Sequence, residues 1–431
     1  MSRSSTTEKP KTARSLASAV VLRVLRDQAF AAAVLSAELD RALTIDDRDR
    51  ALATELVYGT LRARGALEQR INAVAPRGVA DLAVRAELLI AAYQLLLLDR
   101  VPAFAAVSSA VDAVRAMRGA RVAGFVNAVL RKLGQGEKLS AAEAAAQNVP
   151  AWLNQGLEAA VGVEETRSLL TPDGVPAVVL RAIAGRAEPA WLANCERGRI
   201  SPRARLVRGE GDPRRREGYA EGAFLLQEEG AQFVGLALGA RAGERVLDAC
   251  AGRGQKTSLF VEQVGAGEPV WASDAYPKKL DALRSEFARL RLPLPNTRAL
   301  DWTIGAADLP ADFDRVLVDA PCTGTGTLRR RPELAARLAP EDPARLSALA
   351  EQILRRAAER ARSGGRVVFA VCSVLREECE ELVLRVADVL APVAFDAPEL
   401  AGIVPRDAST FRLGPTRFGT DGYFAASFER R

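Results

Sequence analysis

The chain has 431 residues, which is too long for one ordinary hydrophobic core, so we expect about two or three domains. Hydrophobic residues make up 48% and charged residues 26%, both typical of globular proteins, so most of the chain should fold. A net charge of +6 and a pI near 9.2 favour a polyanionic partner. Histidine is absent, which removes imidazole from every mechanism and argues against a zinc site.

Several features indicate where the protein works. Its five cysteines form no Cys-x-x-Cys pair, which is typical of a reducing compartment. Residues 1–12 are rich in Ser, Thr and Lys and lack the apolar centre of a signal peptide, so we predict a disordered tail. The most apolar run, residues 88–98, is far shorter than the roughly 20 residues that a membrane helix needs. We therefore expect a soluble cytoplasmic protein with no membrane segment and no metal.

Residues 13–140 predict a bundle of helices. Apolar residues recur at helical spacing, as at Leu35, Leu39 and Leu43, and Pro76 and Pro102 punctuate the pattern. The many arginines of this region could follow phosphates, but arginine is also common on exposed helix faces. The residue pattern alone favours a structural or dimerising bundle.

Residues 141–225 are harder to interpret. Residues 141–163 predict a helical connector and residues 177–182 a short strand, after which Gly185 and Pro189 interrupt any regular pattern. A strongly basic stretch follows, in which arginine stands at positions Arg203, Arg205, Arg208, Arg214, Arg215 and Arg216. Such runs are usually solvated loops, but they also suit phosphate contacts. We expect a linker and a small α+β module that contacts RNA.

Residues 226–431 predict an α/β domain. Short apolar strands at 246–247, 270–271, 297–300, 316–318 and 366–371 alternate with helical segments. Helices are expected, for example, over residues 282–290 and 346–362. The strands lead to Asp248, Asp274, Asp301, Asp319 and Cys372. Alternating strands and helices predict a doubly wound parallel sheet, whose ligands bind beyond the carboxyl ends of the strands.

The loop after the first of these strands predicts a nucleoside cofactor. Gly252 and Gly254 let the backbone approach a ligand closely, but Gln255 stands where a phosphate-binding P-loop needs glycine, and the third glycine of a dinucleotide loop is missing. Asp274 follows Asp248 by 26 residues, which suits a carboxylate that accepts from both ribose hydroxyls. Asp301 could accept from an adenine amino group. Any one acid could merely cap a helix, but four at successive strand ends favour a site.

The stretch 314–331 places further chemistry at one strand end. A buried strand leads to Asp319, and a loop shaped by Pro321 and glycines holds Cys322 before three arginines at 329–331. A thiolate is a strong nucleophile, and nearby cations lower its pKa. A single buried cysteine is usually inert packing. Because Cys372 also follows a strand, we interpret the two thiols, the acid and the basic run as parts of one substrate site.

These motifs resemble the Sun/Fmu family of RNA cytosine-C5 methyltransferases. The resemblance rests on Asp319-Ala-Pro-Cys-Thr-Gly-Thr-Gly-Thr-Leu-Arg-Arg, Cys372-Ser, Asp248-Ala-Cys-Ala and Asp421-Gly-Tyr-Phe-Ala-Ala. Within the family, the chain is most similar to the ribosomal RNA small subunit methyltransferase B branch, whose amino-terminal domain is similar to the antiterminator NusB. Residues 125–131 resemble the end of that domain. The resemblance implies a Rossmann-like class I methyltransferase domain at 226–431 and a NusB-like RNA-binding domain at 13–140.

The resemblance also implies a cofactor, S-adenosyl-L-methionine, and a role for each site residue. The residues implied to bind the cofactor are Cys250, Ala251, Gly252, Arg253, Gly254, Gln255, Lys256, Asp274, Asp301 and Asp319. Cys372 would attack C6 of a cytosine in 16S ribosomal RNA, Asp319 would hydrogen-bond N3 of the base, and Cys322 would assist loss of the C5 proton. The base must leave its stack to reach both thiols. We expect the enzyme to act as a monomer.

The chain departs from the family pattern at three places, which keeps rival interpretations open. The family usually has Ala-Pro-Gly-Gly-Lys where this chain has Gly-Arg-Gly-Gln-Lys at 252–256, Thr where it has Val371, and His where it has Arg331. The same chemistry on transfer RNA or on another ribosomal RNA cytosine is one rival. A catalytically idle RNA-binding or ribosome assembly factor is another, favoured by the altered loop and opposed by the two cysteines. A small-molecule methyltransferase fits poorly with the basic runs.

Overall fold

The computed structural model describes residues 12–42, 45–172, 176–208, 211–265, 270–306 and 309–431. The chain divides into two compact units, Met1–Ala151 with Arg330–Arg337, and Trp152–Arg329 with Leu338–Arg431. The expected tail lies outside the described residues except for Thr12, whose side chain accepts a hydrogen bond from the Ser15 N–H and begins the first helix. Among the helices of the described part, none is long and apolar enough to cross a membrane.

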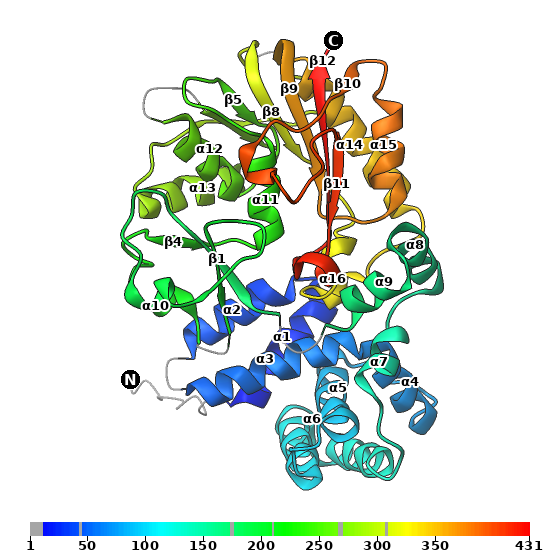
Figure 1. The fold of residues 1–431 in the computed structure, drawn as a ribbon. Coiled ribbons are helices and arrows are strands. Elements are labelled where there is room, and N and C mark those ends of the chain that lie inside the picture. The colour runs from blue at the N-terminus through cyan, green and yellow to red at the C-terminus, as the bar shows by residue number, and fades with distance from the viewer. Residues whose placement is uncertain (1–11, 43–44, 173–175, 209–210, 266–269, 307–308) are drawn as a thin grey trace, which may run out of the picture. The chain divides into compact units, whose positions relative to one another are not determined.

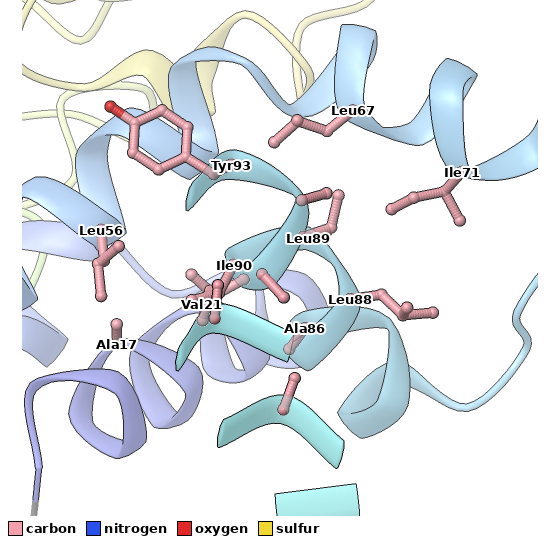
Figure 2. Close-up of a cluster of buried hydrophobic side chains, with 14 of the residues drawn as sticks. Ala17, Val21, Leu56, Leu67, Ile71, Ala86, Leu88, Leu89, Ile90 and Tyr93 are labelled. Carbon is pink, nitrogen blue, oxygen red and sulfur yellow. The ribbon is translucent and has the colours of Figure 1, made fainter. Parts of the chain in front are cut away.

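The first unit is a helical bundle, as its sequence pattern predicts. Its helices are α1 (Ala13–Asp27), α2 (Ala31–Arg41), α3 (Asp47–Arg62), α4 (Arg64–Val74), α5 (Leu82–Leu97), α6 (Ala103–Leu133) and α7 (Ala141–Ala146). Helix α5 is mostly apolar, most of its residues are buried, and it contacts α1, α3, α4 and α6. Figure 2 shows Leu88, Leu89 and Ile90 of α5 among the buried side chains of this core.

The helical unit also contains a segment from much later in the chain. Residues Arg330–Arg337, which include the short helix η3 (Pro332–Leu334), pack with α3. Glu333 Oε1 accepts from the Ala31 N–H at 3.1 Å, and the Arg337 guanidinium donates to the Ala29 carbonyl at 2.6 Å. The guanidinium groups of Arg331 and Arg337 both lie near the Phe30 ring. Arg331 is therefore engaged within the helical unit.

The second unit begins with α8 (Ala151–Val161) and α9 (Val163–Leu170) and continues into a small antiparallel sheet. The sheet has the strand order β2-β3-β1-β4, with β1 (Val178–Ala182), β2 (Glu196–Arg197), β3 (Ala204–Val207), β4 (Phe224–Leu226) and the helices α10 (Ala190–Ala193) and η1 (Pro213–Arg215) in its connections. Leu180, Leu192, Val207 and Phe224 form its core. Only β1 was expected from the sequence, because the other strands are short and irregularly spaced.

The basic stretch of this sheet forms contacts within the protein. Arg205 forms an ion pair with Glu188 at 2.7 Å, Arg214 pairs with Asp212 at 2.5 Å, and the Arg216 guanidinium lies 3.7 Å from the centre of the Trp191 ring. Arg208 is exposed and pairs with Glu196 at 3.3 Å. These arginines stabilise the module itself, so their number alone does not mark a phosphate site.

The larger sheet of the second unit has the order β10-β12-β9-β8-β5-β6-β7, with β11 paired to β12. Its strands are β5 (Val246–Asp248), β6 (Val270–Asp274), β7 (Asn296–Ala299), β8 (Phe313–Asp319), β9 (Ala361–Val371), β10 (Leu390–Pro392), β11 (Thr410–Leu413) and β12 (Tyr423–Arg430). Strands β7, β6, β5, β8 and β9 are parallel, which confirms the predicted doubly wound sheet. The antiparallel strands β10, β11 and β12 at one end were not foreseen.

Helices cover both faces of this sheet, as Figure 1 shows. The helices are α11 (Glu229–Ala237), α12 (Gln255–Val264) and α13 (Pro277–Leu290) on one face, and α14 (Asp342–Ala358) and α15 (Glu380–Arg385) on the other. Side chains alternate along β8, so Leu317 packs with the first group while Val316 and Val318 pack with the second. The expected helix 346–362 ends early, because its last residues already belong to β9.

A buried arginine joins the small sheet to the larger one. Arg181 of β1 is 0% exposed, and it forms an ion pair with Glu262 of α12 and donates to Ser258 Oγ at 2.6 Å. Gln255, at the start of α12, donates to the Leu226 carbonyl of β4 at 2.6 Å. Breaking the ion pair of a buried arginine is costly, because it leaves an unpaired charge away from water. These contacts therefore hold the two sheets in one compact unit. The domain boundary that we propose at 225/226 falls inside β4 of the small sheet.

Candidate active site

Two thiols meet at the carboxyl edge of the parallel strands. Cys372 directly follows β9, and Cys322 lies in the loop after β8. These strands are neighbours, with Asp319 opposite Ala370, so their carboxyl ends reach the same place. The two sulfur atoms lie 3.4 Å apart, and both side chains are partly buried. The structure thus brings together the two cysteines that the sequence singled out.

A lysine and an aspartate lie at the same edge. Lys256, in the first turn of α12, places its Nζ 2.6 Å from Oδ2 of Asp319, the last residue of β8. Burial alone would lower the pKa of Lys256, but the charge of Asp319 and their hydrogen bond raise that pKa above its usual value, and Asp248 and Cys372 act in the same direction. The ammonium therefore stays charged, and it favours a thiolate at Cys372.

The two thiols differ in their electrostatic surroundings. The hydrogen bond with Cys372 raises the pKa of Cys322 well above its usual value, and burial and the negative charges of Cys372 and Glu378 add to this rise. A thiol whose pKa is raised in this way keeps its proton. The hydrogen bond between the two sulfur atoms is therefore one cause of the raised pKa of Cys322.

The loop before α12 has the backbone shape of a ligand cradle. Gly252 and Gly254 have φ angles of 55° and 79°, a region that side chains rarely adopt. A Cβ atom at Gly254 would lie 2.6 Å from Leu283 Cγ, whereas one at Gly252 would meet nothing within 4 Å. The loop therefore packs tightly on α13 at Gly254 and is open at Gly252. Cys250 and Ala251 precede these glycines, and Arg253 between them is exposed.

The acids at the strand ends have different surroundings. Asp274 is buried and accepts from the Gly252 N–H at 3.1 Å, from the Tyr276 N–H at 2.9 Å and from Lys279 at 3.2 Å. Asp301 is exposed, and its Oδ1 accepts from the N–H and the hydroxyl of Thr303. Asp248 faces inward, where Thr257 donates to it at 2.7 Å. Burial raises the pKa of Asp248 to about 7. Asp274 therefore shapes the cradle directly.

Two arginines of the run after Cys322 have partners within their own compact units. Arg329 is buried and donates to Asp421 Oδ1 at 2.7 Å, and Arg331 lies in the helical unit. The Arg329–Asp421 pair instead fixes the approach of β12, where the Gly422 N–H donates to the Gly326 carbonyl at 2.8 Å. The sequence prediction that a basic run converges with the thiols stays a prediction, because a charged run in sequence does not show which side chains have internal partners.

Sequence reasoning missed a buried carboxylate beside the thiols. Glu378 accepts hydrogen bonds from Thr323 and Ser373, the residues that directly follow the two cysteines. In the sequence Glu378 belongs to the charged run Arg-Glu-Glu-Cys-Glu-Glu at 376–381, which is typical of an exposed surface. The only sequence signal for a buried acceptor at this place was the hydroxyl residue that follows each cysteine.

Comparisons with known proteins agree with this geometry. Residues 235–429 match the family described as 16S rRNA methyltransferase RsmB/F, and residues 11–135 match the NusB family. The chain is 39% identical over 425 residues to a putative methyltransferase of Mycobacterium tuberculosis, covering 90% of each chain. It is 34% identical over 376 residues to the ribosomal RNA small subunit methyltransferase B of Thermus thermophilus, covering 86% of each. The chain belongs to the RsmB/F methyltransferase family.

The fold and the cofactor of the RsmB/F family follow for this chain. The crystal structure of PH0851 superposes with a TM-score of 0.84 at 21% identity, covering 98% of this chain and 99% of that one, which supports the same fold. The expected class I methyltransferase domain and NusB-like domain are confirmed. The cofactor of this methyltransferase is S-adenosyl-L-methionine, as the resemblance implied.

The residues present fit that cofactor. The backbone is open at Gly252, and Asp274 stands at the end of the next strand, which suits a nucleoside. The two departures from the family loop do not close this cradle, because Arg253 is exposed and the Gln255 side chain bonds the Leu226 carbonyl. Lys256, which both loops share, reaches Asp319.

Proposed function

We propose that this RsmB/F methyltransferase methylates C5 of a cytosine in 16S ribosomal RNA through a covalent bond between Cys372 and C6. The observation that carries the proposal is the pair of sulfur atoms 3.4 Å apart, beside the Lys256–Asp319 ion pair. C5 of cytosine is a poor nucleophile until a thiolate adds at C6, so the chemistry requires one ionised cysteine. Cys372, which lies near the Lys256 ammonium, has that role.

The other groups would handle charge and protons. When the Cys372 thiolate adds to C6, electron density moves toward C5 and N3. N3 would then take a proton and donate a hydrogen bond to the Asp319 carboxylate, and Lys256 would offset the charge. S-adenosyl-L-methionine supplies the methyl group that C5 takes. Once the Cys372 sulfur is bonded to C6, its charge no longer raises the pKa of Cys322, so Cys322 can ionise and assist removal of the C5 proton. The electron pair left at C5 then reforms the C5–C6 double bond and expels Cys372 as a thiolate.

The cofactor contacts form part of the same proposal. The loop Cys250–Lys256 would surround the cofactor, with Asp274 accepting from the ribose and Asp301 from the adenine amino group. Asp274 already accepts three hydrogen bonds, so a ribose hydroxyl would replace Lys279 or share the carboxylate with it. We further propose that the enzyme acts in the cytoplasm as a monomer on an RNA whose target base is turned out of its stack.

Methyl transfer from labelled S-adenosyl-L-methionine to unmodified small-subunit RNA tests the proposal. Wild type should label cytosine C5, Cys372→Ala should not, and Cys322→Ala should accumulate a protein–RNA adduct that survives denaturation. Cys195→Ala, which alters a thiol in the small sheet, serves as the matched control and should behave as wild type. Full activity in Cys372→Ala would refute the covalent route.

Transfer RNA in a parallel arm separates the nearest rival, because the same chemistry on transfer RNA would label that substrate instead. An idle assembly factor would bind ribosomal RNA without binding S-adenosyl-L-methionine. The departures from the family loop at Arg253 and Gln255 are the reason to consider an idle assembly factor. Titration calorimetry of S-adenosyl-L-methionine binding distinguishes it from an active enzyme.

A further inference from the structure

Two catalytic loops that are far apart in the sequence share one buried anchor. The loop after β8 carries Cys322 and then Thr323, and the loop after β9 carries Cys372 and then Ser373. The short helix η4 (Arg376–Glu378) places the Glu378 side chain between them, where it is 1% exposed. One carboxylate thus lies beside the residues that follow both thiols.

The hydrogen bonds of Glu378 use both of its oxygen atoms. Oε1 accepts from the Thr323 N–H at 2.7 Å, and Oε2 accepts from the Thr323 hydroxyl at 2.5 Å and from the Ser373 hydroxyl. The two hydroxyl oxygens also lie 3.2 Å apart. Several hydrogen bonds to one buried carboxyl group are geometrically demanding, so they fix both loops against each other.

Other contacts also join the two loops, among them the 3.0 Å pair of the Thr325 and Ser373 hydroxyls, but the Glu378 bonds lie next to Cys322. The strands themselves pair only as far as Asp319 and Ala370, and the chain beyond them forms loops. The Gly326 N–H donates to the Cys372 carbonyl at 2.9 Å, but it lies four residues past Cys322. Thr323 is next to Cys322, so its bonds to Glu378 act at the thiol itself. The carboxylate therefore contributes the contact between the loops that lies next to Cys322.

We propose that Glu378 is a positioning residue that holds the Cys322 and Cys372 thiols at the separation that the two-thiol reaction needs. Glu378 would act through Thr323 and Ser373, the residues that follow the two thiols and donate to its carboxylate. For methyl transfer this inference rests on the proposed function. The spacing of the thiols can be tested without any RNA.

Phenylarsine oxide is the probe, because its arsenic condenses with two neighbouring thiols and releases water. The full chain in reduced form is titrated, and free thiols are counted before and after. Wild type should bind one arsenical tightly, and Cys322→Ala should not. Glu378→Gln keeps the size of the side chain but replaces one acceptor by a donor. It should bind the arsenical about tenfold more weakly, because the second thiol has a lower effective concentration near an arsenic atom held by the first.

A matched control and a second variant keep the test decisive. Glu377→Gln makes the same change at the exposed neighbouring residue and should bind the arsenical as wild type does. Thr323→Val removes one hydroxyl and leaves the Thr323 N–H bond, so it should show a smaller loss even where Glu378→Gln folds poorly. Binding of S-adenosyl-L-methionine reports whether each variant is folded.

Methyl transfer provides the second readout. Glu378→Gln should lower kcat by roughly 10- to 100-fold with little change in KM for the cofactor, because misplaced reacting groups mainly slow the chemical step. Wild-type arsenical affinity in folded Glu378→Gln and Thr323→Val would overturn the positioning role. If the arsenical results hold but no variant methylates RNA, the positioning of the thiols stands and the proposed function fails.

Discussion

Lys256 Nζ lies 2.6 Å from Asp319 Oδ2, so the first turn of α12 and the end of β8 are joined by an ion pair at the edge where Cys372 emerges. The pair keeps the ammonium charged although burial opposes this. The positive charge of Lys256 also interacts with Cys372. This relationship connects the cofactor loop to the reactivity of the thiol.

Lys256→Met should make Cys372 less reactive. Without the ammonium, the thiolate loses an attractive charge, so the pKa of Cys372 rises and less of it is ionised at neutral pH. The rate of alkylation of Cys372 by iodoacetamide at pH 7.5, followed by peptide mass spectrometry, should fall about tenfold. The pH midpoint of alkylation should move upward. Lys278→Met, at an exposed lysine, is the control, and equal rates in both variants would contradict the prediction.

Gly254→Ala should damage the cofactor loop far more than Gly252→Ala. Both residues have positive φ angles, which cost a side chain about 1–2 kcal/mol. At Gly254 the new methyl group would also meet Leu283 at 2.6 Å and Phe287 at 3.0 Å, and overpacking of this kind adds about 1–3 kcal/mol. Calorimetric Kd values for S-adenosyl-L-methionine and melting temperatures measure both effects. A similar loss of stability in the two variants would show that α13 moves to make room for a methyl group at position 254.

Arg329→Met should destabilise the second unit strongly. Its partner Asp421 is buried, and a buried charge that loses its partner costs about 3–5 kcal/mol. Arg345→Met breaks an ion pair whose arginine is 62% exposed, so its cost should stay below about 1 kcal/mol. Denaturant unfolding of the full chain compares the two. A small effect at Arg329 would mean that Asp421 finds water or another donor once the arginine is removed.

Glu87→Gln should stabilise the helical unit at high pH more than at low pH. Glu87 is 8% exposed, and burial raises its pKa from 4.5 to about 7 against the hydrogen bond from Ser18. A raised pKa in the folded state means that the folded protein binds more protons, so stability falls as pH rises from about 4.5 to 7. The difference of about 2.5 pKa units corresponds to about 3 kcal/mol.

Melting temperatures of wild type and Glu87→Gln at pH 5 and pH 8 check this sign. The two proteins should melt at similar temperatures at pH 5, where Glu87 is protonated in the fold, and the variant should melt higher at pH 8. Glu143→Gln, at an exposed helix start where hydrogen bonds lower the pKa, should not gain stability at pH 8. If Glu87→Gln melted higher than wild type only at pH 5, the pKa of Glu87 would not be raised in the folded state.

The sequence by itself determined the chemistry at the strand ends. Asp274 and Asp319 end two buried strands, Cys322 and Cys372 follow buried strands, and the carboxyl ends of parallel strands must lie along one edge of a sheet. This rule depends only on local hydrophobic pattern and on alternation of strands with helices. The helical bundle was predictable for the same reason, because periodicity of apolar residues is a local property.

Only the tertiary structure decided which polar side chains meet. Arg329 finds Asp421, and Thr323 finds Glu378 across 55 residues of sequence, although both charged residues lie in runs typical of exposed surface. The small sheet and the antiparallel strand β12 likewise depend on pairing between distant segments. Hydrogen bonds and ion pairs form between groups that the fold places in contact. The residues around a polar group therefore do not indicate which distant residue will be its partner.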